Sequence, residues 1–226
     1  MENFGVVAER APNAFAERAI LAAARILFFE QRDYVQSEKY YAQLKQITAS
    51  QENRLEAMRG LLRSQYQQQK WAEAVDNAKE LITLKGSSND DKSLANMAIG
   101  KSAQINGEYD VAITNFKAVI LVNKAVLSAI ARYEIASTWF MTNRLADAEK
   151  AAFEVINKSG SYDLWVTKAY ILLGDIYFKQ KDYFNAKATF QSVVENSLNA
   201  QLKTEAQTKL NEVIETENKS SKVNTQ

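Results

Sequence analysis

The chain has 226 residues, of which 46% are hydrophobic and 24% are charged; this is the ordinary balance of a folded soluble protein and excludes disorder as the main state. One proline and seven glycines are too few for the frequent turns of a β-sandwich or barrel, so long helices are expected. The absence of cysteine and histidine excludes thiolate and imidazole chemistry, and a net charge of +1 gives no overall field that would attract nucleic acid or anionic lipid.

The chain begins with a short segment, residues 1–13, that lacks the basic and apolar regions of a secretory signal. Phe4 and Val7 stand 37 residues before Tyr41 and Leu44, so the segment fits the second helix of a hairpin whose first helix is missing. The alternative is a short N-terminal helix that caps the first hairpin. Both interpretations predict a helix, and the former also predicts further repeats upstream.

From residue 14 to residue 198 the sequence repeats one pattern five times. Two positions twelve residues apart are mostly occupied by small residues, and an aromatic or aliphatic residue stands three positions before the second of them. In chain order the pairs are Arg25 and Ser37 (the weakest), Leu62 and Ala74, Gly100 and Ala112, Ala136 and Ala148, and Gly174 and Ala186. The second members are 37, 38, 36 and 38 residues apart, so the period is nearly constant.

Each repeat predicts two antiparallel helices joined by a tight turn. Small residues let two helices approach closely, while large residues one turn away fill the grooves beside the contact. A leucine at Gly174 is therefore expected to overpack the contact, whereas alanine is tolerated there if the contact has room for a methyl group. The predicted hairpins are residues 14–50, 51–88, 89–125, 126–162 and 163–198. An ordinary helical bundle is the alternative, but it has no reason to keep a constant interval in five successive hairpins.

Residues 199–217 predict a final helix that closes the stack, because a series of hairpins needs a terminal element with one polar side. Four apolar residues of this segment share one helical face: Leu202, Ala206, Leu210 and Val213. Residues 218–226 contain a single aliphatic residue and are expected to form a disordered tail.

These features resemble the tetratricopeptide repeat (TPR) family, whose helix–turn–helix unit is about 34 residues long. The resemblance covers nearly the whole chain and is clearest from Ala95 to Val193. It implies an all-α, right-handed superhelical solenoid of antiparallel helix hairpins. The sequence is also similar in texture to bacterial envelope-associated members, which favours the cell envelope or periplasm over the cytoplasm and the C-terminal fragment of a longer repeat protein.

No catalytic residue, cofactor site or metal site is predicted. The sequence contains neither a phosphate-binding glycine motif nor the alternating ligands of a calcium loop. The acidic stretch at residues 89–91 is interpreted as the start of a helix, where the helix dipole favours negative charge.

The resemblance implies that the first helices of successive hairpins line a concave groove that holds a peptide. The candidate groove residues are Arg59, Arg63, Tyr66, Lys101, Gln104, Tyr133, Phe140, Asp175 and Phe178. Aromatic anchors flanked by cations fit a peptide with apolar side chains and some negative charge. In the alternative interpretation, the aromatic residues fill a tightly curled interior and the cations are merely solvated.

We therefore expect a non-enzymatic scaffold that binds a peptide or partner protein in the groove, with no nucleic acid partner and no membrane insertion. A helical-repeat RNA-binding module is the alternative. Phosphate contacts need an excess of Lys and Arg along one face, and the 28 basic residues are balanced by 27 acidic ones. An enzyme is the third class, but no paired acid and base residues support it.

Overall fold

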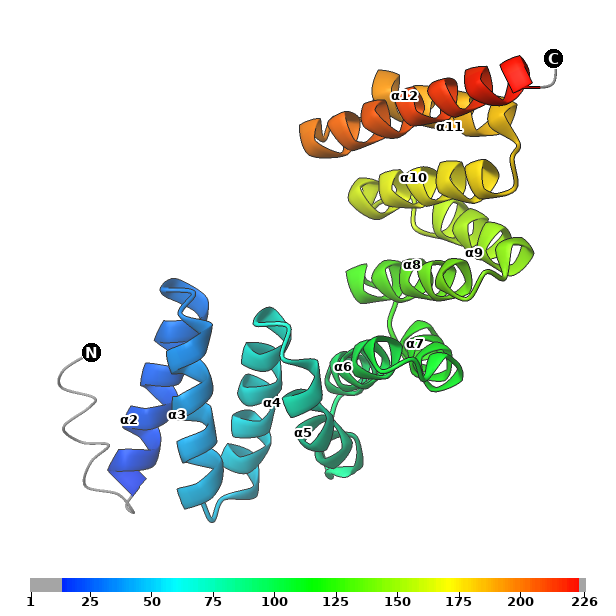
Figure 1. The fold of residues 1–226 in the computed structure, drawn as a ribbon. Helices are drawn as coiled ribbons and strands as arrows, with labels where there is room; N and C mark the ends of the chain where they lie inside the picture. The colour runs from blue at the N-terminus through cyan, green and yellow to red at the C-terminus, as the bar shows by residue number, and fades with distance from the viewer. Residues whose placement is uncertain (1–13, 224–226) are drawn as a thin grey trace. The chain divides into compact units, whose positions relative to one another are not determined.

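The structure, a computed structural model, describes residues 14–223, and every regular element in that range is helical (Figure 1). The predicted N-terminal segment, residues 1–13, lies outside the described residues. The helices are α2 (Ala14–Arg25) with the π-helical turn η1 (Ile26–Glu30), α3 (Tyr34–Ile47), α4 (Gln51–Gln67), α5 (Trp71–Thr83), α6 (Asn89–Ile105), α7 (Tyr109–Val122), α8 (Val126–Met141), α9 (Leu145–Lys158), α10 (Asp163–Lys179), α11 (Tyr183–Asn196) and α12 (Ala200–Val223). The predicted all-α helical-repeat fold is confirmed.

The chain forms two compact units, Met1–Asn123 and Lys124–Gln226. In the first unit, α2, α4 and α6 each pack against the helix that follows them, and in the second α8 and α10 do the same before the terminal helix α12. The first helices of successive pairs also contact one another within each unit: α2 with α4 and α4 with α6, then α8 with α10 and α10 with α12. We call the surface formed by these helices the first-helix face of each unit.

The turns inside the hairpins are tight although only one of them uses glycine. In each turn a residue in the left-handed conformation follows the end of the first helix: Arg32, Gln69, Gly107, Asn143 and Lys181. In four of the turns the next N–H then donates to the carbonyl five residues earlier, for example Lys70 to Gln65 at 3.0 Å and Asp182 to Tyr177 at 2.9 Å. This is the Schellman arrangement that ends many helices. One turn, repeated, explains how a chain with few glycines and prolines forms successive hairpins.

In two hairpins the helices meet where a glycine receives an aromatic ring. A Cβ atom on Gly100 would lie 2.5 Å from the ring of Phe116, and a Cβ atom on Gly174 would lie 2.6 Å from the ring of Phe190. The predicted close contact at Gly174 is therefore present, but the residue that fills it stands sixteen positions later rather than twelve. No room for a methyl group remains at either glycine.

The positions that correspond to Gly174 and Phe190 hold side chains of other sizes in two other hairpins. They are Ala136 and Ala152 in α8 and α9, and Leu62 and Ala78 in α4 and α5, and all four are buried. Leu62 of the first helix is thus matched by the small Ala78 of the second, the reverse of Gly174 and Phe190, as close packing requires; Ala136 and Ala152 are both small.

The first hairpin departs from the predicted pattern. Arg25 stands where a small residue was expected, and its side chain is 52% exposed and pairs with Glu56 of α4. The ring of Tyr41 packs instead on the next hairpin, where a Cβ atom on Gly60 would lie 2.2 Å from it. Ser37 donates to the carbonyl of Ala24 at 3.1 Å. A long charged side chain cannot be buried at a close contact, so the contact moves to the following helix.

The terminal helix is longer than predicted. Its apolar face packs on α11, with all four predicted apolar residues buried, but α12 continues to Val223 rather than ending at Glu217. The expectation of a disordered tail from residue 218 is therefore wrong as far as Val223. Lys187 of α11 forms an ion pair with Glu217, and Lys219 lies 3.8 Å from Glu215 one turn earlier. These contacts favour continued helix in a stretch that contains a single aliphatic residue, Val223.

Candidate functional site

The first-helix face of unit 1 carries a chain of alternating charges across three helices. Arg25 of α2 donates to Glu56 of α4 at 2.7 Å, and Glu56 lies 3.8 Å from Arg59. Arg59 Nε in turn donates to Asp91 Oδ2 of α6 at 2.8 Å, and Arg59 Nη2 lies 2.8 Å from the same oxygen in an ion pair. The charges of these four residues balance, so they tie α2, α4 and α6 together without leaving an excess.

The start of α6 explains why Asp91 is available as a buried partner. Ser88 and Asp91 form a capping box, in which Asp91 N–H donates to Ser88 Oγ at 3.1 Å and Ser88 N–H donates to Asp91 Oδ2 at 2.8 Å. The Asp91 side chain is only 4% exposed. A buried carboxylate needs donors and an opposite charge, and Arg59 supplies one hydrogen bond and the positive charge. The helix start predicted at residues 89–91 is confirmed, and Arg59 stabilises it by binding the Asp91 carboxylate.

Arg63 lies one helical turn beyond Arg59 and is half-buried. It makes no ion pair with any carboxylate within the described part of the chain. Its charge acts on the phenol of Tyr41, whose pKa burial raises to about 12. Arg63 therefore adds a positive charge to the first-helix face of unit 1, where the charges of the other four residues (Arg25, Glu56, Arg59 and Asp91) balance.

The other predicted residues of unit 1 are held by neighbours. Tyr66 meets Trp71 edge to face, with ring centroids 5.0 Å apart, at the turn between α4 and α5. Lys101 donates to Gln104 at 2.9 Å within α6, and Gln104 is 6% exposed. Gln104 is thus a buried partner of Lys101 and not an accessible surface residue.

The first-helix face of unit 2 is aromatic at its centre. Tyr133 of α8 and Trp165 of α10 pack with centroids 5.4 Å apart, and Lys168 lies 4.5 Å above the Trp165 ring. Burial raises the pKa of Tyr133 to about 12, and the carboxylates of Glu134 and Glu205 act in the same direction. The phenol is therefore neutral at physiological pH and keeps its O–H as a donor.

Asp175 lies between Tyr133 and the terminal helix. Lys209 of α12 donates to both of its carboxylate oxygens, at 2.7 and 2.9 Å. Burial still raises the pKa of Asp175, although Lys209 opposes this and the carboxylates of Glu205 and Glu212 add to it. Lys209 thus pairs with Asp175, while the carboxylates of Glu134, Glu205 and Asp175 all act to raise the pKa of Tyr133.

Two predicted aromatic residues of unit 2 contribute to packing. Phe140 lies under Lys179 of α10, with Nζ 5.0 Å from the ring centroid. Phe178 packs 6.1 Å from Tyr183 and against the core cluster shared by α11 and α12. Both rings are half-buried, so each fixes the spacing of helices and leaves only part of its surface for a ligand.

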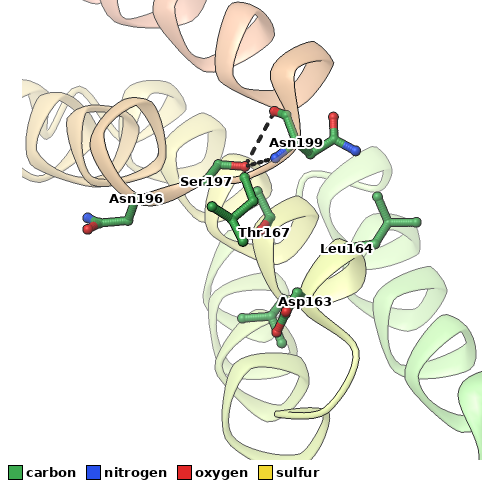
Figure 2. A pocket seen from close by; sticks show the side chains of 8 residues that line it. Asp163, Leu164, Thr167, Asn196, Ser197 and Asn199 are labelled. Carbon is green, nitrogen blue, oxygen red and sulfur yellow. Dashed lines mark hydrogen bonds between the residues drawn. The ribbon is translucent and has the colours of Figure 1, made fainter.

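A separate cavity of about 550 Å³ opens between the start of α10 and the turn from α11 to α12 (Figure 2). The residues that line it are Asp163, Leu164, Val166, Thr167, Asn196, Ser197, Leu198 and Asn199. Asn199 Oδ1 accepts from Leu202 N–H at 3.1 Å, and Ser197 Oγ accepts from Asn199 N–H at 3.2 Å, so part of the polar wall is used in capping α12. Sequence reasoning missed this cavity because it forms where two turns meet, outside the helix periodicity.

Four partners were also missed: Arg25, Asp91, Trp165 and Lys209. Each stands about one repeat from the residue that it contacts; Arg59 and Asp91, for example, are 32 residues apart, and Asp175 and Lys209 are 34 apart. A search for opposite charges separated by one repeat would have found the charged pairs.

No helix in the described range is both long and apolar enough to span a membrane. Within the same residues no group of three or more carboxylates is placed to hold a metal ion.

Comparisons with known proteins agree with this geometry. A family model described as tetratricopeptide repeat matches residues 97–163, and another with the same description matches residues 167–199. The crystal structure of a thermophilic TPR protein of Thermus thermophilus is similar, with a TM-score of 0.55 at 17% identity over 86% of this chain and 99% of that chain. Two crystal structures of MamA give TM-scores of 0.53 and 0.57 at 17% and 16% identity, covering 85% and 80% of this chain and 93% and 97% of theirs. A search of curated proteins gave no match. At these identities the likeness concerns the fold.

Proposed function

Because the chain is a tetratricopeptide-repeat protein, we propose that it is a non-enzymatic scaffold that binds a peptide or partner protein on its first-helix faces. In each unit these helices lie side by side, which gives an extended surface along which successive side chains of a peptide are read. The repeats supply the shape, and the residues on the face supply the chemistry.

The observation that carries the proposal is the charge of Arg63. Arg59, one turn earlier, forms ion pairs with Asp91 and Glu56, whereas Arg63 forms no ion pair with another described residue. A half-buried guanidinium loses hydration, and an acidic ligand compensates for that loss with a charge-assisted hydrogen bond. The first-helix face of unit 1, considered by itself, is therefore proposed to bind an acidic peptide.

Unit 2 is proposed to take apolar side chains. Tyr133 and Trp165 form a partly exposed aromatic surface, and the phenol group of Tyr133 itself is neutral. Aromatic residues of this kind are enriched where partners bind tightly, because they offer large rigid contact areas.

The proposal is tested by selecting peptides from a random library on the immobilised chain and comparing binding to variants. Arg63→Glu is the test substitution, and Lys79→Glu, at an exposed position of α5, is the matched control. Acidic peptides are expected to be enriched, to lose at least about tenfold in affinity to Arg63→Glu, and to bind Lys79→Glu as they bind the wild type. Arg59 is left intact because its removal would disturb α6.

Failure to enrich any peptide would contradict the scaffold proposal. Enriched peptides that bind the wild type and Arg63→Glu equally would place the working surface outside the first-helix face of unit 1. Thermal unfolding of both variants checks that the fold is unchanged.

A further inference from the structure

The turn between α6 and α7 holds the one Asn–Gly pair of the chain, Asn106–Gly107. Asn106 is the C-cap of α6, and Gly107 follows in the left-handed conformation with a φ of 79°. Both residues are exposed, and the turn lies inside unit 1, at the end of α7 away from Asn123. Apart from the chain neighbours of Gly107, no atom lies within 4 Å of the place that a Cβ atom would take on it.

Three other turns carry glutamine where α6 ends in Asn106. The C-cap residues of η1, α4 and α10 are Gln31, Gln68 and Gln180, and each is followed by a left-handed residue that has a side chain. The backbones are alike, with ψ between −18° and −1° at the four C-caps. The repeat thus accepts either amide here, and only at the end of α6 does the shorter amide precede a glycine.

An asparagine before a glycine reacts with its own backbone, which makes it one of the thermolabile positions of a protein. The backbone nitrogen of the next residue attacks Cγ and closes a five-membered succinimide ring. The bond from Cγ to Nδ2 breaks, and ammonia leaves with the proton of the attacking nitrogen. Water then opens the ring at either carbonyl and gives aspartate or isoaspartate. A side chain on the next residue hinders the attack, and glycine has none.

We propose that Asn106 is a site of spontaneous deamidation, with the backbone nitrogen of Gly107 as the internal nucleophile. The Asn106 side chain is exposed and makes no hydrogen bond with another residue of the described range, so Cγ is accessible. Gly107 N–H donates to the carbonyl of Gln104 at 3.3 Å, whereas the equivalent bonds of three other turns measure 2.9–3.1 Å. The attacking nitrogen is therefore held less firmly than its counterparts.

Opening of the turn controls the rate of this reaction. With ψ of Asn106 at −1°, the Gly107 nitrogen is turned away from the Asn106 side chain, so the peptide must rotate before the ring closes. The rotation breaks the bond from Gly107 to Gln104 and the bond from Glu108 N–H to the carbonyl of Ala103, which measures 2.8 Å. Helix ends open locally at a lower free energy than the core, so the reaction proceeds in the folded chain and is faster in the unfolded chain.

The isoaspartyl product changes the turn permanently. Its backbone runs through the side-chain methylene, so the main chain between α6 and α7 gains one atom. The bond from Glu108 to Ala103 closes the end of α6 and cannot keep its geometry in the longer turn. Both products also add a carboxylate at the C-terminal end of α6, where the helix dipole disfavours negative charge. Ageing at Asn106 therefore loosens the hairpin of α6 and α7.

Ageing of the intact chain at mildly alkaline pH, followed by peptide mapping with mass spectrometry, tests the proposal. The peptide that contains Asn106 is expected to gain the mass that replaces an amide by a carboxyl group and to divide into aspartyl and isoaspartyl forms. Asn143 is the matched control within the chain, because it also lies exposed in a hairpin turn, but Arg144 follows it and donates to the carbonyl of Trp139 at 2.9 Å. Asn143 is expected to stay unchanged over the same period. A folded chain in which Asn106 also stays unchanged would overturn the proposal.

Asn106→Gln is the control variant, since three other turns carry glutamine at this position and the fold is expected to tolerate it. The variant is expected to show no conversion at residue 106 over the same period, because glutamine would have to close a less favourable six-membered ring. In hydrogen exchange, the aged wild type is expected to lose protection at Glu108 N–H, and the aged variant to keep it. The wild type in denaturant is expected to convert at least about tenfold faster than the folded chain. Equal conversion of the variant and the wild type, or equal rates for folded and unfolded wild type, would contradict the proposed reaction or its control by the turn.

Discussion

The contact of a glycine with an aromatic ring sixteen residues later is the residue-level device that closes two of the hairpins. The sequence shows that Gly174 is small and repeats with Gly100, but it does not show which side chain occupies the space. Periodicity pointed to the alanine twelve residues on, whereas Phe190 fills the gap. The direction in which a side chain leans along its helix decides this, and residue spacing alone does not contain it.

Gly174→Ala is expected to destabilise the chain, although alanine has the higher helix propensity. The new Cβ atom would lie 2.6 Å from the Phe190 ring, and overpacking of a well-filled core costs about 1–3 kcal/mol. Thermal unfolding measures the effect. Gly160→Ala is the control, because nothing lies within 4 Å of its added Cβ atom. Equal melting temperatures for Gly174→Ala and the wild type would show that the ring moves aside freely.

The two neighbouring arginines of α4 are expected to differ in their effect on stability. Arg59→Ala removes one hydrogen bond and the ion-pair partner of the buried Asp91 carboxylate, which costs about 2–3 kcal/mol. Arg63→Ala breaks no ion pair among the described residues and is expected to cost less than about 1 kcal/mol. Denaturant unfolding of both variants checks the difference. A larger loss for Arg63→Ala would assign Arg63 a structural role and remove the basis of the peptide proposal.

At the scale of the elements, helix periodicity predicted the hairpins well, but the ion pairs that join one hairpin to the next could not be read from it. Glu80 of α5 accepts from Lys45 of α3 and Arg54 of α4, both at 2.7 Å, so a single carboxylate ties three helices. Such pairs depend on how helices from different repeats are placed. The early end predicted for α12 has a similar cause, since Lys187 of another helix holds Glu217.

The three-helix contact of Glu80 makes a prediction about acid stability. The hydrogen bond from Lys45, and then that from Arg54, lower the pKa of Glu80. A carboxyl group with a lowered pKa stabilises the fold above its unfolded-state pKa of about 4.3, and this contribution is lost as pH falls through the lower folded-state value. Glu80→Gln is therefore expected to lower the melting temperature at pH 7 and to differ less from the wild type at pH 3.

Glu73→Gln serves as the control for the acid series. Glu73 is exposed in the same helix and makes no ion pair with another described residue, so its difference from the wild type is expected to be small at both pH values. A Glu80→Gln variant whose deficit is unchanged from pH 7 to pH 3 would show that the ion pairs contribute nothing and that another contact of the side chain is responsible.

At the scale of the whole molecule, the repeat pattern predicted the architecture because four of the five hairpins use the same turn, although the close contacts between their helices differ. The candidate site was less predictable. The helical register correctly placed Tyr133 and Asp175 on one face. It did not predict Trp165 and Lys209, which contact them there. It also selected Gln104, which is buried, because a helical register does not show how closely the neighbouring helices pack. The contacts made by side chains of adjacent helices, and the burial that these helices cause, were thus the features that could not be predicted from the sequence.

The central claim is that the first-helix face of unit 1 binds an acidic peptide through Arg63, and a charge exchange tests it most directly. An acidic peptide selected on the wild type is resynthesised with its contacting acidic residue changed to lysine, and both peptides are titrated against the wild type and Arg63→Glu by calorimetry. We expect the lysine peptide to lose at least about tenfold in affinity for the wild type and to regain affinity for Arg63→Glu, because opposite charges are restored. A lysine peptide that binds Arg63→Glu no better than it binds the wild type would contradict the claim.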